Sequence, residues 1–278
     1  MPLTGKELSA LQQRAKKLRK DIVDTTVWAG GAHIGGANSI VDILNILYFK
    51  YARVDTKNPQ WADRDRIIVS KGHAGVGVAA VLAEKGFYKK ELLKTFNHFM
   101  SPFGMHLDCH RVPGLDVSTG SLGHGLAQGV GLAWGARFQG KDWKTFVILG
   151  DGECNEGSVW EAAMSASQFK LDNLITIVDR NGLMMDGTTE QVMGLEPFDK
   201  KWEAFGFKVR IIDGHDFTQL ADALDFALEN KGGPVVIIAN TVKGKGVDFI
   251  ENDVRWHYGS MDSALAKKAM ESIDRMYE

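Results

Sequence analysis

Short apolar runs rich in β-branched residues alternate with helical patterns along this chain, and this alternation constrains the fold more than any other feature. The runs lie at residues 66–70, 145–150, 174–179 and 235–240, with a fifth candidate at residues 207–213. Helical patterns lie between them, for example at residues 157–169 and 217–228. Strands that alternate with helices pair in parallel, and the helices cover both faces of the sheet. We therefore predict an α/β fold with an open, mostly parallel sheet.

The region before the first predicted strand is expected to be helical. Apolar side chains recur at steps of three and four residues from Leu8 to Ile22 with lysines between them, which is typical of an amphipathic helix. A second helix is predicted at about residues 39–51. The chain has 278 residues, enough for one substantial core, and we expect residues 1–278 to form a single domain.

Composition argues against two classes of partner, nucleic acids and membranes. Lys and Arg total 33 against 35 Asp and Glu, so the net charge of -2 gives no field that would gather nucleic acid or an anionic lipid surface. No apolar run approaches the roughly 20 residues that a membrane-spanning helix needs. The first 20 residues lack the apolar stretch of a secretory signal, and the only cysteines are Cys109 and Cys154. We therefore expect a cytoplasmic location.

Polar residues follow two of the predicted strands at the edge where ligands bind in open α/β sheets. Asp151 and Gly152 come directly after the second strand, and Asn181 follows the third. A carboxylate oxygen, an amide oxygen and the backbone carbonyl of Leu183 are hard ligands that suit Mg²⁺, with phosphate oxygens and water completing the shell. Taken singly, Asp-Gly and Asn-Gly pairs are more often ordinary turns.

Several motifs resemble those of the transketolase family, in the same order along the chain. They are A-H-x-G-G at His33, S-x-G-H-A at His73, a G-x-H before P-G at His106, S-T-G-S-L-G-x-G, G-D-G-E-x-x-E-G, and then Asn181 and His257. The resemblance covers essentially the whole chain. It implies a thiamine-diphosphate-binding fold and an enzyme that transfers a two-carbon ketol unit from a ketose or ketose phosphate to an aldose or aldose phosphate.

The resemblance also implies roles for individual residues. The metal, Mg²⁺ or alternatively Ca²⁺ or Mn²⁺, would be bound by Asp151, Asn181 and the backbone oxygen of Leu183. Thiamine diphosphate would be contacted by His73, Gly120, Ser121, Leu122, Gly152, Glu156, Asn181 and His257. The substrate channel would be lined by the catalytic histidines His33, His106 and His257. Imidazole has an ordinary pKa of about 6.5, so it can donate or accept a proton near neutrality.

Three features leave alternatives open. The family usually has His-Pro-Glu where this chain has His106, Leu107 and Asp108, so the shape of this loop and the choice of substrate are open to change. Cys109 and the neighbouring histidines form a possible metal cluster, but they lack the four-ligand spacing of zinc sites. Lys243 and Lys245, after the last predicted strand, either lend positive potential to an anionic ligand or are ordinary solvated lysines.

Length carries a further expectation, because members of this family normally continue into a pyrimidine-binding domain and a C-terminal domain. We expect neither domain within residues 1–278. The resemblance therefore implies the N-terminal subunit of a split transketolase, active only with a partner subunit that carries both domains, as an α2β2 heterotetramer. Glu156 matches a family glutamate near the subunit interface. Alternatives are a subunit of a 1-deoxyxylulose-phosphate-synthase-like or other ketol transferase, or a non-catalytic assembly subunit that binds thiamine diphosphate. The donor and acceptor sugars stay open.

Overall fold

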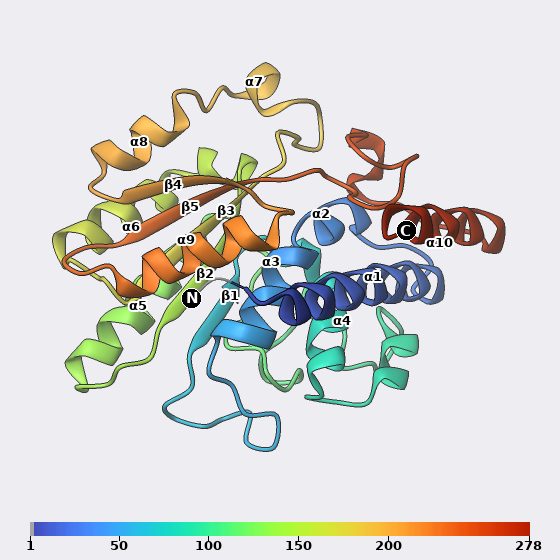
Figure 1. The fold of residues 1–278 in the computed structure, drawn as a ribbon, viewed down its shortest axis with the longest axis horizontal. Coiled ribbons are helices and arrows are strands. Elements are labelled where there is room, and N and C mark those ends of the chain that lie inside the picture. Colours follow the sequence, from blue (N-terminus) through green and yellow to red (C-terminus); the bar gives the residue numbers. More distant parts are fainter. Residues whose placement is uncertain (1–2) are drawn as a thin grey trace.

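Five parallel strands form the centre of the structure, a computed structural model that describes residues 3–278 (Figure 1). The strands are β1 (Arg66–Val69), β2 (Thr145–Gly150), β3 (Leu174–Arg180), β4 (Lys208–Asp213) and β5 (Val235–Asn240). Their order in the sheet is β1-β2-β3-β5-β4, and every neighbouring pair runs parallel. The predicted α/β class and all five predicted strands are confirmed.

Helices cover both faces of the sheet, as predicted (Figure 1). The hydrophobic core on the first side is shared by α1 (Gly5–Trp28), α3 (Val41–Ile46), α4 (Gly75–Lys85), α9 (Phe217–Glu229) and α10 (Ser263–Met276), and α10 packs against α1. The second face carries α5 (His124–Phe138), α6 (Gly157–Gln168) and α8 (Phe198–Ala204). Alternate side chains of one strand serve the two layers, because successive residues of a strand point to opposite faces. In β2, Phe146 and Ile148 pack in the first layer, whereas Val147 and Leu149 pack in the second.

The two helices predicted before the sheet are confirmed, the second with a different start. Helix α1 forms as expected and begins with a capping box between Thr4 and Glu7. The second helix, predicted at about residues 39–51, is confirmed from residue 41 onward: α3 continues directly into a π-helical turn (Leu47–Tyr51), and α2 (Ile34–Ser39) precedes it. The break falls at Ile40, whose φ of -100° and ψ of 3° interrupt the helix. Tertiary contacts override the local pattern here, because the Ser39 hydroxyl is held by the core residue Asp179.

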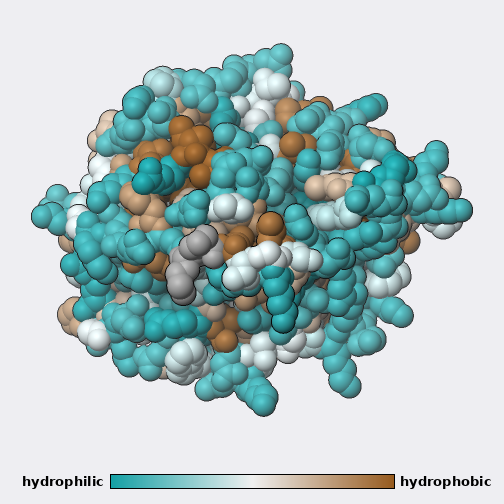
Figure 2. Space-filling view, in the orientation of Figure 1, coloured by the Kyte–Doolittle hydropathy of each residue, from teal (hydrophilic) through white to brown (hydrophobic). Residues whose placement is uncertain are grey.

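Short helices and loops follow the carboxyl ends of the strands. They are α7 (Thr189–Val192) and the 3₁₀ segments Gly72–Ala74, Lys90–Thr95, Gly152–Asn155 and Val254–His257. Most of the face seen in Figure 2 is hydrophilic, with hydrophobic residues in separate small patches. Across residues 3–278, no helix is both long and apolar enough to cross a bilayer.

Candidate active site

The G-D-G turn and the Asn-Gly turn lie side by side at the carboxyl edge of the sheet, as predicted. Gly150 in β2 pairs with Asp179 in β3, so both strands end at the same level. The Asp151 carboxylate joins the two turns: it accepts hydrogen bonds from the backbone N–H of Gly152 at 2.7 Å and of Gly182 at 2.6 Å. Asp151 is only 2% exposed. Burial, and then the nearby charge of Asp179, raise the pKa of Asp151, which a bound cation would counteract.

Three oxygen atoms near this turn have the chemistry of a site for a hard divalent cation. The side chain of Asn181 donates from Nδ2 to Asp179 at 2.8 Å, while its Oδ1 accepts the backbone N–H of Leu183 at 3.1 Å. The carbonyl of Leu183 already accepts from the ammonium group of Lys243 at 3.2 Å. A carboxylate, an amide oxygen and a backbone carbonyl are the oxygen ligands that Mg²⁺ and Ca²⁺ take in proteins. The residues therefore fit the implied metal.

A cavity of about 410 Å³ opens over these turns. The residues that line it include His73, Gly120, Leu122, Asp151, Gly152, Glu156, Asn181, Leu183 and His257. The structure thus brings together most of the predicted cofactor and metal ligands. Ser121 is exposed beside Gly120 and Leu122, and Glu156 is exposed at the start of α6, so both lie toward the solvent side of the site.

Lys243 points into this cavity, which makes the solvated-lysine alternative wrong for this residue. The side chain is 2% exposed, and its ammonium group donates to the carbonyl of Met184 at 2.9 Å and to Nδ1 of His257 at 3.0 Å. These partners and the Leu183 carbonyl are all neutral groups. Burial, and then the charge of Lys71, lower the pKa of Lys243 to about 8. A buried ammonium group with neutral hydrogen-bond partners suits an anionic ligand such as diphosphate.

Asp179 is the centre of a buried network that sequence reasoning missed. It is fully buried, and its carboxylate accepts from Lys71, from Ser39 at 2.7 Å, from Asn181 at 2.8 Å and from Thr241. Burial raises the pKa of Asp179, but Lys71 and the hydroxyl donors outweigh it and hold the pKa below its ordinary value. This network fixes the orientation of the Asn181 amide, because Nδ2 is held by Asp179. Its sequence signal is an acidic residue at the end of an otherwise apolar strand.

Glu153 was also missed, and it holds the loop of residues 120–123 against the G-D-G turn. Its buried carboxylate accepts from the Ser70 hydroxyl and from the backbone N–H groups of Gly123 at 2.8 Å and Gly150 at 3.0 Å. In the same loop Gly120 has a φ of 152°, and a Cβ atom there would lie 2.9 Å from the His106 ring. Only glycine fits at this position without displacing a predicted catalytic histidine.

Four predicted histidines gather beside the cavity from four separate segments. An isolated antiparallel bridge between Ala32 and Gly259 brings the segment of His33 next to that of His257. The ring centroid of His33 lies 5.2 Å from that of His73, 5.3 Å from that of His257 and 6.4 Å from that of His106. His73 and His257 line the cavity itself, while His33 and His106 lie beyond them. The structure therefore brings the predicted substrate-channel residues together.

The protonation of this cluster differs from the ordinary imidazole assumed from the sequence. Burial, and then neighbouring charges, lower the pKa of His33 and of His257 to about 4. Burial and Lys71 lower that of His73 to about 2. These three rings are therefore neutral at pH 7. Because an ammonium group only donates, Nδ1 of His257 accepts from Lys243 and its proton is on Nε2.

This cluster predicts that the isolated chain becomes less stable as the pH falls. The unfolded chain binds a proton at His73 below its ordinary pKa of 6.5, whereas the folded chain does so only near pH 2. At pH 5 this difference costs about 2 kcal/mol of unfolding free energy. Urea unfolding measures the decrease in unfolding free energy from pH 7 to pH 5. In His73→Gln this decrease should be smaller than in the wild type by that amount. The exposed-site control His110→Gln should keep the wild-type loss, and an equal loss in all three proteins would contradict the prediction.

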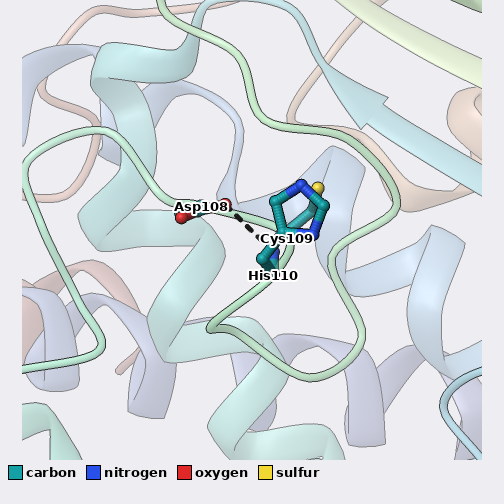
Figure 3. A group of neighbouring side chains, drawn as sticks. All are labelled: Asp108, Cys109 and His110. Atoms are coloured by element: carbon teal, nitrogen blue, oxygen red, sulfur yellow. Dashed lines mark hydrogen bonds between the residues drawn. The ribbon is translucent and has the colours of Figure 1, made fainter.

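A separate group of ligand-type side chains lies on the loop after His106 (Figure 3). Ligand atoms of Asp108, Cys109 and His110 all lie within 4.8 Å of one another, and in the described part of the chain no other such group of three is found. The Asp108 carboxylate instead accepts from the backbone N–H of His110 at 3.0 Å and from Ser118 at 3.1 Å. These bonds are those of a structured turn, so this group does not form a closed metal site of the four-ligand kind.

The oxygen atoms of Asp151, Asn181 and Leu183 and the inward lysine thus line one cavity at the carboxyl edge of the sheet, and their chemistry would suit a metal-bound diphosphate. Comparison with known proteins identifies the protein family. Residues 10–274 match the family described as transketolase, thiamine diphosphate binding domain. This chain belongs to the transketolase family, whose members are thiamine-diphosphate-dependent transferases.

Two relatives match over nearly their whole length. A 6-deoxy-6-sulfo-D-fructose transketolase subunit from Clostridium sp. strain MSTE9 is 38% identical over 95% of this chain and 96% of its own length. An apulose-4-phosphate transketolase subunit from Actinobacillus succinogenes is 43% identical over 95% of both chains. The crystal structure of transketolase from Campylobacter jejuni superposes with a TM-score of 0.89 at 32% identity. It matches 95% of this chain, which spans 42% of that enzyme. The chain is thus an N-terminal transketolase subunit.

Proposed function

We propose that this chain binds the metal and diphosphate end of thiamine diphosphate in a two-subunit transketolase. The observation that carries the proposal is one cavity that joins three hard oxygen ligands to a buried lysine with neutral partners. The metal ligands are Asp151, Asn181 and the carbonyl of Leu183. Mg²⁺ is the proposed ion because two phosphate oxygens and one water would complete its octahedral shell.

The diphosphate contacts come from groups that donate hydrogen bonds into the cavity. Lys243 supplies charge, and Nε2–H of His257 supplies a neutral donor, since the other nitrogen of that ring accepts from Lys243. His73 and the backbone at Gly152 complete the diphosphate side, and Gly120, Ser121 and Leu122 line the thiazolium side. Glu156 lines the same cavity and is exposed, so we propose that it lies near both the cofactor and the interface with a partner subunit.

The catalytic residues are proposed to be His33, His106 and His257. When bound, thiamine diphosphate supplies the carbon nucleophile that allows a carbon–carbon bond of the sugar to be broken and remade. The histidines orient substrate hydroxyl groups and accept or return their protons. His33 is neutral at pH 7, so it is able to accept a proton without first losing one.

A partner subunit is proposed to supply the pyrimidine-binding and C-terminal domains. The two relatives described above are both named as transketolase subunits, and this naming implies a second chain. We propose an α2β2 heterotetramer in the cytoplasm, with residues 1–278 as the single cofactor-binding domain of this chain. The non-catalytic alternative is disfavoured because the histidine cluster is assembled beside the cavity.

The proposed substrates are sugar phosphates or related acidic sugars, in a two-carbon transfer between a ketose and an aldose. The two relatives are named for 6-deoxy-6-sulfo-D-fructose and apulose 4-phosphate, and these names include an anionic sulfo group and a phosphate group. The family's His-Pro-Glu is replaced here by His106, Leu107 and Asp108, and we propose that this loop contributes to substrate choice.

Supplying the assembled complex with different donors tests the reaction class. In the presence of thiamine diphosphate and Mg²⁺, we expect two-carbon transfer from a ketose phosphate to an aldose phosphate. Mass spectrometry of the sugar products measures this transfer. Pyruvate is the control donor. Release of CO₂ from pyruvate, without transfer from any ketose, would instead support the 1-deoxyxylulose-phosphate-synthase-like alternative.

A further inference from the structure

A buried charged network connects the N-terminal helix to the loop that carries Lys243. Asp42 in α3 is 2% exposed and forms a two-pronged ion pair with Arg19 of α1, at 3.0 Å and 2.6 Å. The same carboxylate contacts Nδ1 of His215, in the loop between β4 and α9, at 2.8 Å. These residues lie outside the cofactor cavity, and the proposed chemistry does not use them.

Both outer arms of this network end on the loop after β5. The backbone N–H of Val242 donates to Nε2 of His215 at 2.9 Å, and Nε of Arg19 donates to the carbonyl of Lys245 at 3.0 Å. The two bonded residues lie on either side of Lys243. Since the Val242 N–H group only donates, Nε2 of His215 accepts and its Nδ1–H donates to Asp42. One carboxylate therefore fixes both anchors of the loop.

This arrangement affects the position of Lys243, because the ammonium group of that side chain has only three hydrogen-bond partners in the described part of the chain. Its hydrogen-bond partners, the carbonyls of Leu183 and Met184 and a ring nitrogen of His257, are neutral and themselves belong to loops or short helical turns. A flexible four-carbon side chain reaches a fixed point only if its backbone is fixed. The anchors on Val242 and Lys245 hold that backbone on two sides, together with two backbone hydrogen bonds: Gly244 N–H donates to the Gly35 carbonyl and Asn252 N–H to the Lys243 carbonyl, both at 2.9 Å.

We propose that His215 is a positioning residue, which holds the 242–245 loop so that Lys243 meets the diphosphate. The proposal rests on the proposed function, since it requires that Lys243 binds the cofactor. The network of Arg19, Asp42 and His215 would then affect cofactor affinity as well as the stability of the fold.

Two substitutions of His215 separate the loop anchor from the rest of the network. His215→Asn retains an N–H group that reaches Asp42 but is too short to accept from Val242, whereas His215→Gln reaches Val242. In the assembled complex with Mg²⁺, calorimetry should show thiamine diphosphate binding weakened about tenfold in His215→Asn. His215→Gln should bind within about threefold of the wild type. Hydrogen exchange at residues 241–246 should be faster than in the wild type in His215→Asn but not in His215→Gln.

A double-substitution cycle tests whether His215 acts through Lys243. Lys243→Met alone should weaken binding, and adding His215→Asn to it should cause no further loss, because coupled residues are not additive. Tyr88→Phe is the control: it removes a buried hydrogen bond to Ala79 in a distant part of the core and should leave cofactor affinity unchanged.

The outcomes distinguish the inference from the proposed function. Unchanged binding in Lys243→Met would overturn the role of Lys243 itself, and this inference with it. Weakened binding in Lys243→Met with unchanged binding in His215→Asn would overturn the inference alone. Full additivity, or an equal loss in Tyr88→Phe, would show that the network acts only on stability. If His215→Asn does not assemble, faster exchange of the loop in the His215→Gln complex at unchanged affinity would likewise overturn the inference.

Discussion

Asp151→Ala is expected to abolish detectable binding of thiamine diphosphate with Mg²⁺, weakening it by at least about a hundredfold. The carboxylate is the one anionic ligand among the three proposed metal ligands, and it also joins the two turns through Gly152 and Gly182. Calorimetry on the assembled complex measures the affinity directly. A second readout is the cofactor-induced rise in melting temperature, which should disappear because a ligand stabilises only the state that binds it.

The stability of the cofactor-free complex should change little in the same variant. Burial and Asp179 disfavour the charged form of Asp151 and raise its pKa, so its removal also relieves an unfavourable charge. Asp108→Ala serves as the matched control, because it removes another loop carboxylate that bonds to backbone but lies outside the cavity. Unchanged cofactor binding in Asp151→Ala would return this residue to the role of an ordinary turn aspartate.

Features that depend on neighbouring residues in the sequence were predictable. The strands are continuous apolar, β-branched runs, and a parallel sheet buries such strands on both faces. Asp151 and Asn181 were placed together because each directly follows one of two successive strands, and those strands are neighbours in the sheet. The edge strand β4 is the exception in burial, with Ile211 56% exposed, whereas the other edge strand, β1, is buried along its whole length.

Features that depend on distant residues were not predictable. Lys71 follows β1 and Asp179 lies in β3, and only the folded chain makes them a buried ion pair, beside Gly36 and Ser39 of α2. Lys243 reads as a loop lysine until β5 is placed between β3 and β4, which turns its loop toward the Asn181 turn. The lowered pKa values of His33, His73 and His257 have the same origin, since burial is their largest cause.

The largest effect of all is expected from the partner subunit. The cavity over Asp151 offers contacts for the diphosphate and the metal, and the pyrimidine end of the cofactor would be held by the second chain. This chain alone should therefore give no measurable ketol transfer, even with saturating thiamine diphosphate and Mg²⁺. Adding the partner should raise the rate from background by several orders of magnitude, because proton transfer and orientation then act together.

The most direct test of the two-subunit enzyme is ketol transfer measured with this chain alone, with the partner alone and with both. The partner is identified by co-purification with this chain from its own cells. Activity is expected only in the mixture, with a maximum at an equal molar ratio and with none when Asp151→Ala replaces the wild type. Ketol transfer at full rate by this chain alone, or by the partner without it, would contradict the proposed division of the active site between two chains.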